Sequence, residues 1–565
     1  MDSNLNIALE KLFNERKDFI IIGLTGRTGS GCTTVAELLT KDFRDLDLPI
    51  PKVQEFHTNE ERKYSVLHKY AERNWVKFTR IKMSDIITSF ILEDNFQQFR
   101  SFVEEVFPKK DLAPLDFLRP NFDEMHKERL RFKQAVEENE ENLKSPDIYG
   151  FYFIRIPSFT QKLKDKFDEI NKEMYTKIYQ RIASNIRCSG TALLNTFNGE
   201  NIFKLAQRTN TLIKILRRKN KEDKGRVLVV IDTIRNPYEA TFFKDRYSSF
   251  YLFSINTEEK ERRDRLGTKG LIPKQIDEID KIEYPGKLSD SARFWSQDIQ
   301  SCIELSDVYL YNPHSLMIDL TEVKKGIVKY VTLIMHPGLI SPTHVERSMQ
   351  IAFNAKLNSG CISRQVGAVV TDDNYSIKSV GWNTVAECQI PCNLRSLNRL
   401  VRRHDKEAFS DYELKNETFT AKCIEKSNKA MEDNLNGRTY HYCFKDIYND
   451  LSIPPKKNQV HTRSLHAEEN AFLQISKYGG TGIMNGYLFS TASPCELCSK
   501  KAYQLGIKKI YYIDPYPGIS AEHTLMNGSR DPEMILFQGA IGRGFTQLYT
   551  QILPLKDELE ILLGD

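Results

Sequence analysis

A set of residues near the C-terminal end of the chain has the types and spacing of a catalytic zinc site. His466 and Glu468 form a His-x-Glu pattern in "SLHAEENAFLQI", and Cys495 and Cys498 follow in Pro-Cys-x-x-Cys within "STASPCELC". One imidazole and two thiolates suit Zn²⁺ and leave a fourth tetrahedral position for water. We therefore predict zinc ligands at His466, Cys495 and Cys498, with Glu468 beside the metal rather than on it.

This residue set indicates a hydrolytic site rather than a structural one. Zinc lowers the pKa of a bound water to about 7, and a neighbouring carboxylate can take its proton and pass it to a leaving group. A structural zinc ribbon would instead be expected to carry a second Cys-x-x-Cys. We therefore assign Glu468 as the catalytic acid and base.

Helix starts must position these side chains. Cys495 and Cys498 stand at i and i+3 where a helix opens, so they face the same direction, and the helix dipole favours their thiolates. His466 likewise opens a helix with apolar positions at Ala471 and Phe472. Upstream, "RQVGAVVTDDNYSIKSVGWN" predicts two strands joined by a turn at residues 372–374.

From near Ser341 onward the chain resembles the deoxycytidylate deaminase branch of the cytidine deaminase superfamily. The matching stretches, in order, are "SGCISRQVGAVV", "SVGWN", "LHAEENA", "SPCELC" and "LGIKKIYY". The resemblance implies an α/β/α domain with a mixed sheet, in which Glu468 protonates N3 of cytosine and then the departing ammonia. It also implies substrate contacts by Asn383 to the sugar, by the Ala467 N–H to the base oxygen, and by the Ser493 carbonyl to the amino group.

An insertion of about residues 384–460 departs from the short form of that family. The resemblance to phage-type members implies a second, structural zinc, for which Cys361, Cys388, Cys392 and a later histidine such as His461 are candidates. The alternative is that these cysteines are free and buried. Arginines of the insertion either hold substrate phosphates or form a basic surface helix; they are Arg395, Arg399, Arg402 and Arg403.

A second candidate site lies near the N-terminus in "IIIGLTGRTGSGCTTV". Its spacing matches the Walker A pattern G-x-x-x-x-G-K-[ST], except that Cys32 replaces the lysine. Backbone N–H groups of such a turn cradle phosphates, and Asp232, at the end of an expected buried strand over residues 227–231, could hold a metal. The predicted nucleotide-binding residues are Gly26, Arg27, Thr28, Gly29, Ser30, Gly31, Cys32, Thr33 and Asp232.

Residues 15–325 resemble the P-loop nucleotide and dephospho-coenzyme A kinases. The resemblance implies a P-loop kinase-like α/β domain that binds ATP, GTP or a deoxynucleoside triphosphate with Mg²⁺, and arginines that close over the phosphates (Arg262, Arg263 and Arg265). Cys32 leaves three interpretations open: a decayed phosphate-binding site, a working site whose cation comes from Arg27 or another subunit, or a purely structural domain.

The length and composition of the chain indicate how many domains carry these two sites. The chain has 565 residues, 40% hydrophobic and 28% charged, with a formal charge of +5, so we expect two α/β domains, over residues 1–335 and 336–565. No apolar run of membrane-spanning length is present, and we expect a cytoplasmic protein with no membrane partner. The ten cysteines then favour metal ligation over disulfides.

The combination of the two domains resembles the bacterial anti-phage deaminases. That resemblance implies action on free dCTP and dCMP, nucleotide depletion during infection, control through the P-loop domain and an inhibitory antitoxin RNA, and a homo-oligomer. Two other functions stay open: deamination of single-stranded DNA or RNA, which would need a basic channel and aromatic platforms, and nucleotide sensing with an inactive deaminase scaffold.

Overall fold

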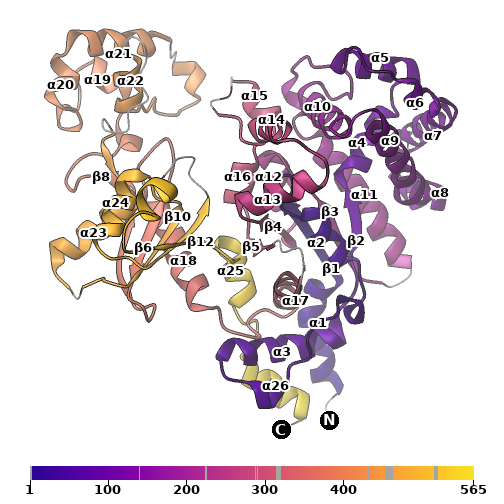
Figure 1. The fold of residues 1–565 in the computed structure, drawn as a ribbon, viewed down its shortest axis with the longest axis horizontal. Coiled ribbons are helices and arrows are strands. Elements are labelled where there is room, and N and C mark those ends of the chain that lie inside the picture. The colour runs from indigo at the N-terminus through magenta and orange to yellow at the C-terminus, as the bar shows by residue number, and fades with distance from the viewer. Residues whose placement is uncertain are drawn as a thin grey trace. The chain divides into compact units, whose positions relative to one another are not determined.

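The computed structural model describes residues 3–138, 140–222, 225–286, 288, 290–313, 320–429, 432–451, 462–480, 482–514 and 520–564. The chain forms two compact units, residues 1–341 with 538–565, and residues 342–537 (Figure 1). Within the described ranges, no helix has both the length and the apolar character needed to span a membrane. We describe each unit by itself.

The first unit is built on a six-stranded sheet with the order β13-β5-β4-β1-β3-β2. Its strands are β1 (Phe19–Thr25), β2 (Thr79–Lys82), β3 (Val227–Asp232), β4 (Phe250–Asn256), β5 (Val308–Tyr311) and β13 (Gly539–Ala540). Strands β1 to β5 are parallel, and β13 pairs antiparallel with β5. The strands expected at 19–24 and 227–231 are confirmed.

Both faces of this sheet are covered, because side chains along a strand alternate between faces. On β1, Ile20 and Ile22 pack into one apolar cluster and Ile21 into another. The first cluster includes α2 (Cys32–Leu39), α3 (Asn59–Asn74) and α17 (Thr321–Met335). The result is a parallel sheet between two helical layers.

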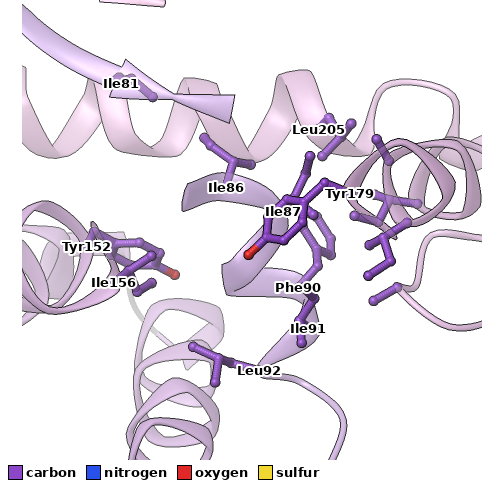
Figure 2. Close-up of a cluster of buried hydrophobic side chains, with 14 of the residues drawn as sticks. Ile81, Ile86, Ile87, Phe90, Ile91, Leu92, Tyr152, Ile156, Tyr179 and Leu205 are labelled. Atoms are coloured by element: carbon purple, nitrogen blue, oxygen red, sulfur yellow. The ribbon is translucent and has the colours of Figure 1, made fainter. Parts of the chain in front are cut away.

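The second cluster belongs to a large helical region between β2 and β3. Its main helices are α4 (Met83–Ile91), α5 (Phe96–Val106), α7 (Arg119–Glu138), α9 (Ile156–Ile170), α10 (Met174–Ser189) and α11 (Lys204–Glu222). Figure 2 shows α4 side chains such as Ile87 and Phe90 placed between Tyr152 and Ile156 on one side and Tyr179 and Leu205 on the other. The charged residues of 100–145 predict solvated helices, but Phe102, Phe107, Phe122 and Phe132 are buried in this core, whereas Phe117 is exposed.

Seven further helices of six residues or more belong to the described part of the first unit. They are α1 (Ser3–Asp18), α12 (Pro237–Arg246), α13 (Glu259–Thr268), α14 (Pro273–Glu283), α16 (Ile299–Glu304), α25 (Gly542–Tyr549) and α26 (Leu555–Leu563). The domain boundaries expected from sequence assigned residues 538–565 to the second domain. In the structure, β13 extends the first sheet, and Arg543 of α25 donates hydrogen bonds to the carbonyl oxygens of Lys244 and Phe250. These pairings attach the C-terminal segment to the first unit.

The second unit contains a five-stranded mixed sheet with the order β12-β11-β10-β6-β7. Its elements are α18 (His344–Ala355), β6 (Gly367–Thr371), β7 (Ile377–Trp382), α23 (Ala467–Tyr478), β10 (Tyr487–Ala492), α24 (Glu496–Gln504), β11 (Lys509–Asp514) and β12 (Glu533–Leu536). Helix α23 lies directly on β7, because a Cβ at Gly381 would come within 2.4 Å of the Ala467 oxygen. A mixed sheet and the strand pair β6–β7 are as expected from sequence.

The long insertion is closed at its base by two short strands. Thr384–Val385 (β8) pairs with Ser464–Leu465 (β9). Between them lie α19 (Leu397–Val401), α20 (Asp411–Lys415), α21 (Glu417–Lys429) and α22 (Phe444–Asp450), which pack around their own apolar cluster, centred on Phe419.

Arg395 has a structural role in this insertion, which corrects its interpretation as a phosphate ligand. Its side chain is fully buried, forms an ion pair with Glu413 and donates to the Tyr442 hydroxyl and the Ala408 oxygen. Arg399, in contrast, is mostly exposed and lies 3.6 Å from Asp405. A guanidinium that is fully buried in this core cannot reach substrate phosphates.

Replacing Arg395 by methionine is expected to lower the free energy of unfolding by about 3–5 kcal/mol, because the buried Glu413 would lose its hydrogen-bonded cation and keep only the more distant Arg463, at 3.6 Å. The matched change Arg399→Met removes an exposed pair and should cost less than about 1 kcal/mol. Urea denaturation of the full chain, followed by fluorescence, measures both. Equal effects of the two substitutions would contradict the assignment.

Candidate metal centre and substrate cavity

The predicted zinc ligands converge at the starts of two helices. His466 is the residue before α23, and Cys495 is the residue before α24, with Cys498 in its first turn. The Nδ1 atom of His466 lies 3.3 Å from the Cys495 sulfur and 3.5 Å from the Cys498 sulfur. The ligand atoms of these three side chains all lie within 4.8 Å of one another. Among the described residues, no other set of three His, Cys, Asp or Glu side chains is grouped in this way.

The donor set fits a tetrahedral zinc ion. With Zn–S bonds of about 2.3 Å and Zn–N bonds of about 2.0–2.1 Å, nitrogen and sulfur ligands of one ion are separated by roughly 3.5 Å. The two N···S distances agree with this value. Hydrogen bonding to Cys498 and His466 lowers the pKa of the Cys495 thiol, which favours the thiolate form that zinc binds.

Glu468 lies beside these ligands and is almost completely buried, with 3% of its surface exposed. The Ser490 hydroxyl on β10 donates a hydrogen bond of 3.0 Å to its Oε1 atom. Burial raises the pKa of the Glu468 carboxyl, against the opposing effects of its own backbone hydrogen bond, His466 and Ser490. A carboxyl group in this environment can alternate between its protonated and ionised forms more readily than an exposed one.

His466, Cys495 and Glu468 line a cavity of about 250 Å³. Asn383, Ala467 and Ser493, the predicted substrate contacts, all line it. Both atoms of the Asn383 amide are engaged with backbone: Oδ1 accepts from the Val366 N–H and Nδ2 donates to the Arg364 oxygen. Asn383 therefore holds the loop before β6 in the cavity wall, which sequence reasoning did not foresee.

Two cationic residues of this cavity were missed by the sequence analysis. Arg364 stands in the loop before β6 and forms an ion pair with the buried Asp514, and Lys445 comes from α22 of the insertion. Arg364 lies within the stretch "SGCISRQVGAVV" that carries the family resemblance, so it could have been predicted as a cationic residue near the site. Lys445 is separated from the other cavity residues in sequence, and no local pattern marks it.

The second zinc site stays a prediction. Cys361 lies on the cavity wall, Cys392 is buried and Cys388 is exposed. His461 lies outside the described residues. The described part of the chain brings no second set of three ligand atoms together.

In the first unit, the glycine turn after β1 lies between a strand and a helix, as expected. A carboxylate of the same chain is bound to it, which was not expected. Gly26, Gly29 and Gly31 have positive φ, and a Cβ at Gly31 would lie 2.0 Å from the Asn312 amide. The buried carboxylate of Glu283, at the end of α14, accepts from the Thr28 N–H at 3.0 and 3.2 Å and also from the Thr28 hydroxyl. An internal carboxylate thus takes the backbone donor that a phosphate would use.

The arginines expected to cover phosphates instead hold the turn itself. Arg262 donates to the Thr28 oxygen at 3.0 Å, and Arg265 donates to the Ser30 oxygen at 3.1 Å. Arg263 pairs with Asp277, and Arg27 pairs with Glu259 and Asp280. Arg27 is therefore already engaged and does not replace the missing lysine within this chain.

The other two features of this predicted nucleotide site are also satisfied internally. Asp232 forms an ion pair with Arg80 and accepts from the Thr233 hydroxyl at 2.8 Å. Cys32 is buried, and burial, reinforced by Asp232, raises the pKa of its thiol to about 12. These contacts disfavour the expected Mg²⁺ triphosphate at the turn and a reactive thiolate at Cys32.

Comparison with known proteins finds a likeness for the second unit. Residues 342–514 match the family model described as "Cytidine and deoxycytidylate deaminase zinc-binding region". This part of the chain, about a third of its length, is therefore similar to that zinc-binding region. This match includes His466, Glu468, Cys495 and Cys498.

Three individual relatives each match a part of this chain. The chain is 27% identical over 169 residues to deoxycytidylate deaminase of Enterobacteria phage T2, covering 30% of this chain and 78% of that protein. It is 43% identical over 54 residues to ComE operon protein 2 of Bacillus subtilis (strain 168), covering 10% of this chain and only 28% of that relative. The structure of dCMP deaminase from cyanophage S-TIM5 with dCMP and dUMP is 24% identical, covers 35% of this chain and 99% of that chain, and has a TM-score of 0.21.

Proposed function

We propose that the protein is a zinc-dependent deaminase of free deoxycytidine nucleotides, converting dCMP, dCTP or both to the uracil forms. The observation that carries this proposal is one cavity lined by His466, Cys495 and Glu468 together with two cations, Arg364 and Lys445. The family match of residues 342–514 supports it, and so does the likeness to a phage deoxycytidylate deaminase.

In this reaction the metal ligands, Glu468 and the Ala467 N–H have separate roles. His466, Cys495 and Cys498 would hold Zn²⁺, which when bound supplies an activated water for hydrolysis. Glu468 takes one proton from the attacking water and delivers it to the ring nitrogen N3. It then takes a second proton, from the hydroxyl group formed at C4, and delivers it to the departing ammonia. Its buried position and the Ser490 hydrogen bond keep its carboxyl facing the base. The Ala467 N–H, in the first turn of α23, is available to bind the base oxygen because such donors have no partner inside the helix.

The cations favour a phosphorylated substrate over a nucleoside. Arg364 and Lys445 line the same cavity as the catalytic groups, where an anionic phosphate gains charge-assisted hydrogen bonds. Arg364 is paired with Asp514, but its side chain is still 32% exposed, unlike the fully buried Arg395. A free nucleotide also fits better than a polynucleotide, because the overall charge of +5 is small for 565 residues and a strand needs an extended basic groove.

Ammonia release from a substrate panel tests the proposal. The purified full chain should act on dCMP or dCTP at least about tenfold faster, by kcat/KM, than on deoxycytidine or single-stranded DNA, a difference of about 1.4 kcal/mol. Lys445→Met should raise KM for the nucleotide and leave deoxycytidine turnover unchanged. The control Lys422→Met, at a partly exposed lysine paired with Glu425, should change neither. Faster deamination of DNA than of nucleotides, or no ammonia from any cytosine compound, would refute the proposal.

The biological role follows from the resemblance to anti-phage deaminases. In this proposal the enzyme depletes deoxycytidine nucleotides during infection, works as a homo-oligomer in the cytoplasm, and is restrained by an antitoxin RNA until infection. Control through the first unit is part of the same proposal. A fall of the cellular dCTP pool on infection that depends on Glu468 is the expected result.

A further inference from the structure

Aromatic side chains and arginines alternate along a surface of the first unit that is built by α11 and α12. The two helices contact each other, and both pack onto one face of the six-stranded sheet through the apolar cluster of Figure 2. Along α12, Tyr238, Phe242 and Arg246 follow one another at intervals of four residues, so they lie on one side of the helix, about 6 Å apart along its axis. This side stays partly exposed, whereas Ala240 and Phe243 are buried.

Rings from neighbouring segments extend the aromatic part of this surface. Phe294 stacks on Tyr238 with 5.6 Å between ring centroids, and Phe197 stacks on Phe294 at 6.5 Å. Phe203, which directly precedes α11, lies 5.6 Å from Phe242. Phe197 and Phe294 keep 41% and 40% of their surface exposed. Aromatic surface therefore remains accessible to a ligand.

Arginines continue the surface toward the amino ends of the strands. Arg246 lies over the Phe242 ring at 5.1 Å, and Arg217 of α11 lies over the Phe19 ring at 4.5 Å. Tyr247, the residue after Arg246, contacts the Phe19 ring at 5.6 Å and so joins the two positions. Both arginines are exposed, and neither forms an ion pair within the part of the chain that the structure describes. They are therefore available to an external anion.

A cavity of about 830 Å³ lies at the end of this surface. Phe19 begins β1 and Val227 begins β3, so the cavity lies at the edge of the sheet opposite to the glycine turn. Asp18 in its wall is 3.5 Å from Arg226. The basic residues of the wall outnumber the acidic ones; they are Lys11, Lys214, Arg217 and Arg218, against Glu15 and Asp18. The excess positive charge favours an anionic ligand.

Stacked rings alternating with arginines suit one class of partner. Proteins bind single-stranded nucleic acids by stacking bases on aromatic side chains and by holding the phosphates in a basic groove. A guanidinium serves both purposes, because it stacks on rings and donates paired hydrogen bonds to phosphate oxygens. A duplex would leave the aromatic rings unused, because its bases are already stacked on one another.

We propose that this aromatic and basic surface of the first unit binds a single-stranded nucleic acid. Bases stack on the exposed rings of Phe197 and Phe294, and phosphates contact Arg217 and the basic cavity. Stacking and phosphate contacts do not involve the 2′-hydroxyl, so the surface does not distinguish ribose from deoxyribose. The inference goes beyond the proposed deaminase function and does not depend on it, because all of these residues belong to the first unit.

Fluorescence anisotropy of a labelled strand of about 15 nucleotides, with the full chain, tests the proposal. Oligouridylate and oligothymidylate contain no cytosine, so the deaminase site cannot consume them. They should bind within a few-fold of each other and at least about tenfold more tightly than a duplex or polyphosphate of the same charge. Hydrogen exchange should show protection of residues 204–220 and 237–246.

Three results would overturn the proposal: no binding, binding no tighter than that of polyphosphate, or protection confined to residues 342–537. Because the measurement involves no turnover, such a failure would leave the deaminase proposal standing. Ammonia release from the nucleotide panel tests that proposal separately.

Phe294→Ala tests the stacking part of the surface. It removes the central ring between Phe197 and Tyr238 and should weaken strand binding about tenfold while leaving its salt dependence unchanged. The control Phe117→Ala, at a phenylalanine of the same unit that is 78% exposed, should leave binding unchanged. Native affinity in Phe294→Ala would contradict the proposal.

Arg217→Met tests the phosphate contacts. It should weaken binding and reduce the slope of log affinity against log salt concentration by about 0.7, the value for one phosphate of a single strand. Arg119→Met is the matched control, because Arg119 is exposed and lies over a phenylalanine ring as well, that of Phe96 at 6.0 Å. It should change neither quantity. An unchanged slope in Arg217→Met would contradict the proposal.

Discussion

Replacing Glu468 by glutamine is expected to lower deamination by about 10²–10⁴-fold, the usual contribution of a general acid–base residue. Glutamine keeps the size of the side chain and can still accept from the Ser490 hydroxyl, but it cannot carry a proton to N3 or to the amino group. Because Glu468 lies outside the group formed by His466, Cys495 and Cys498, zinc content should not change. Ammonia release and metal analysis of the same preparation give both values.

Glu469 supplies the matched control. It is the next residue on α23, only partly buried, where it pairs with Lys501 and accepts from the His466 N–H at 3.4 Å. Glu469→Gln retains a side-chain acceptor for that N–H and should keep activity within a few-fold of native. If Glu468→Gln stayed within that range as well, the assignment of the proton carrier would be wrong.

Replacing Cys498 by serine is expected to remove one equivalent of zinc per chain and reduce deamination to background. Serine offers a hard, largely protonated oxygen in place of a thiolate, and the cluster then retains only two suitable ligands. The unfolding temperature should also fall, because bound metal stabilises the folded state. A chelator should produce the same losses in the native protein, and added Zn²⁺ should reverse them there but not in Cys498→Ser.

A cysteine-to-serine change in the first unit is the control that distinguishes loss of the metal from a general loss of stability. Cys188 is buried and its sulfur donates to the Asn195 oxygen at 3.2 Å, a contact that a serine hydroxyl can replace. Cys188→Ser should retain zinc and activity. Full zinc content in Cys498→Ser would mean that another side chain completes the site, and the ligand assignment would then have to change.

The sequence indicated the chemistry of the second unit because its signals are local. His466 and Glu468 share one helix start, and Cys495 and Cys498 share another, so only two short segments had to be interpreted. Strands β1 and β3 were equally clear as short apolar runs. In these cases the residues that matter are neighbours along the chain, and the periodicity of helix or strand fixes their relative directions.

Only the tertiary structure decided which partners the remaining charged groups have. Glu283 reaches the Thr28 N–H across 255 positions, and Arg80 reaches Asp232 across 152. Arg395 became a core residue because Glu413 and Tyr442 fold around it. The strand pairing of β13 with β5 likewise moved residues 538–565 from the expected second domain to the first unit. Such contacts join distant segments through side chains of ordinary type, so no spacing in the sequence records them. The candidate zinc ligands lie at two helix starts, and their spacing alone was enough to predict them.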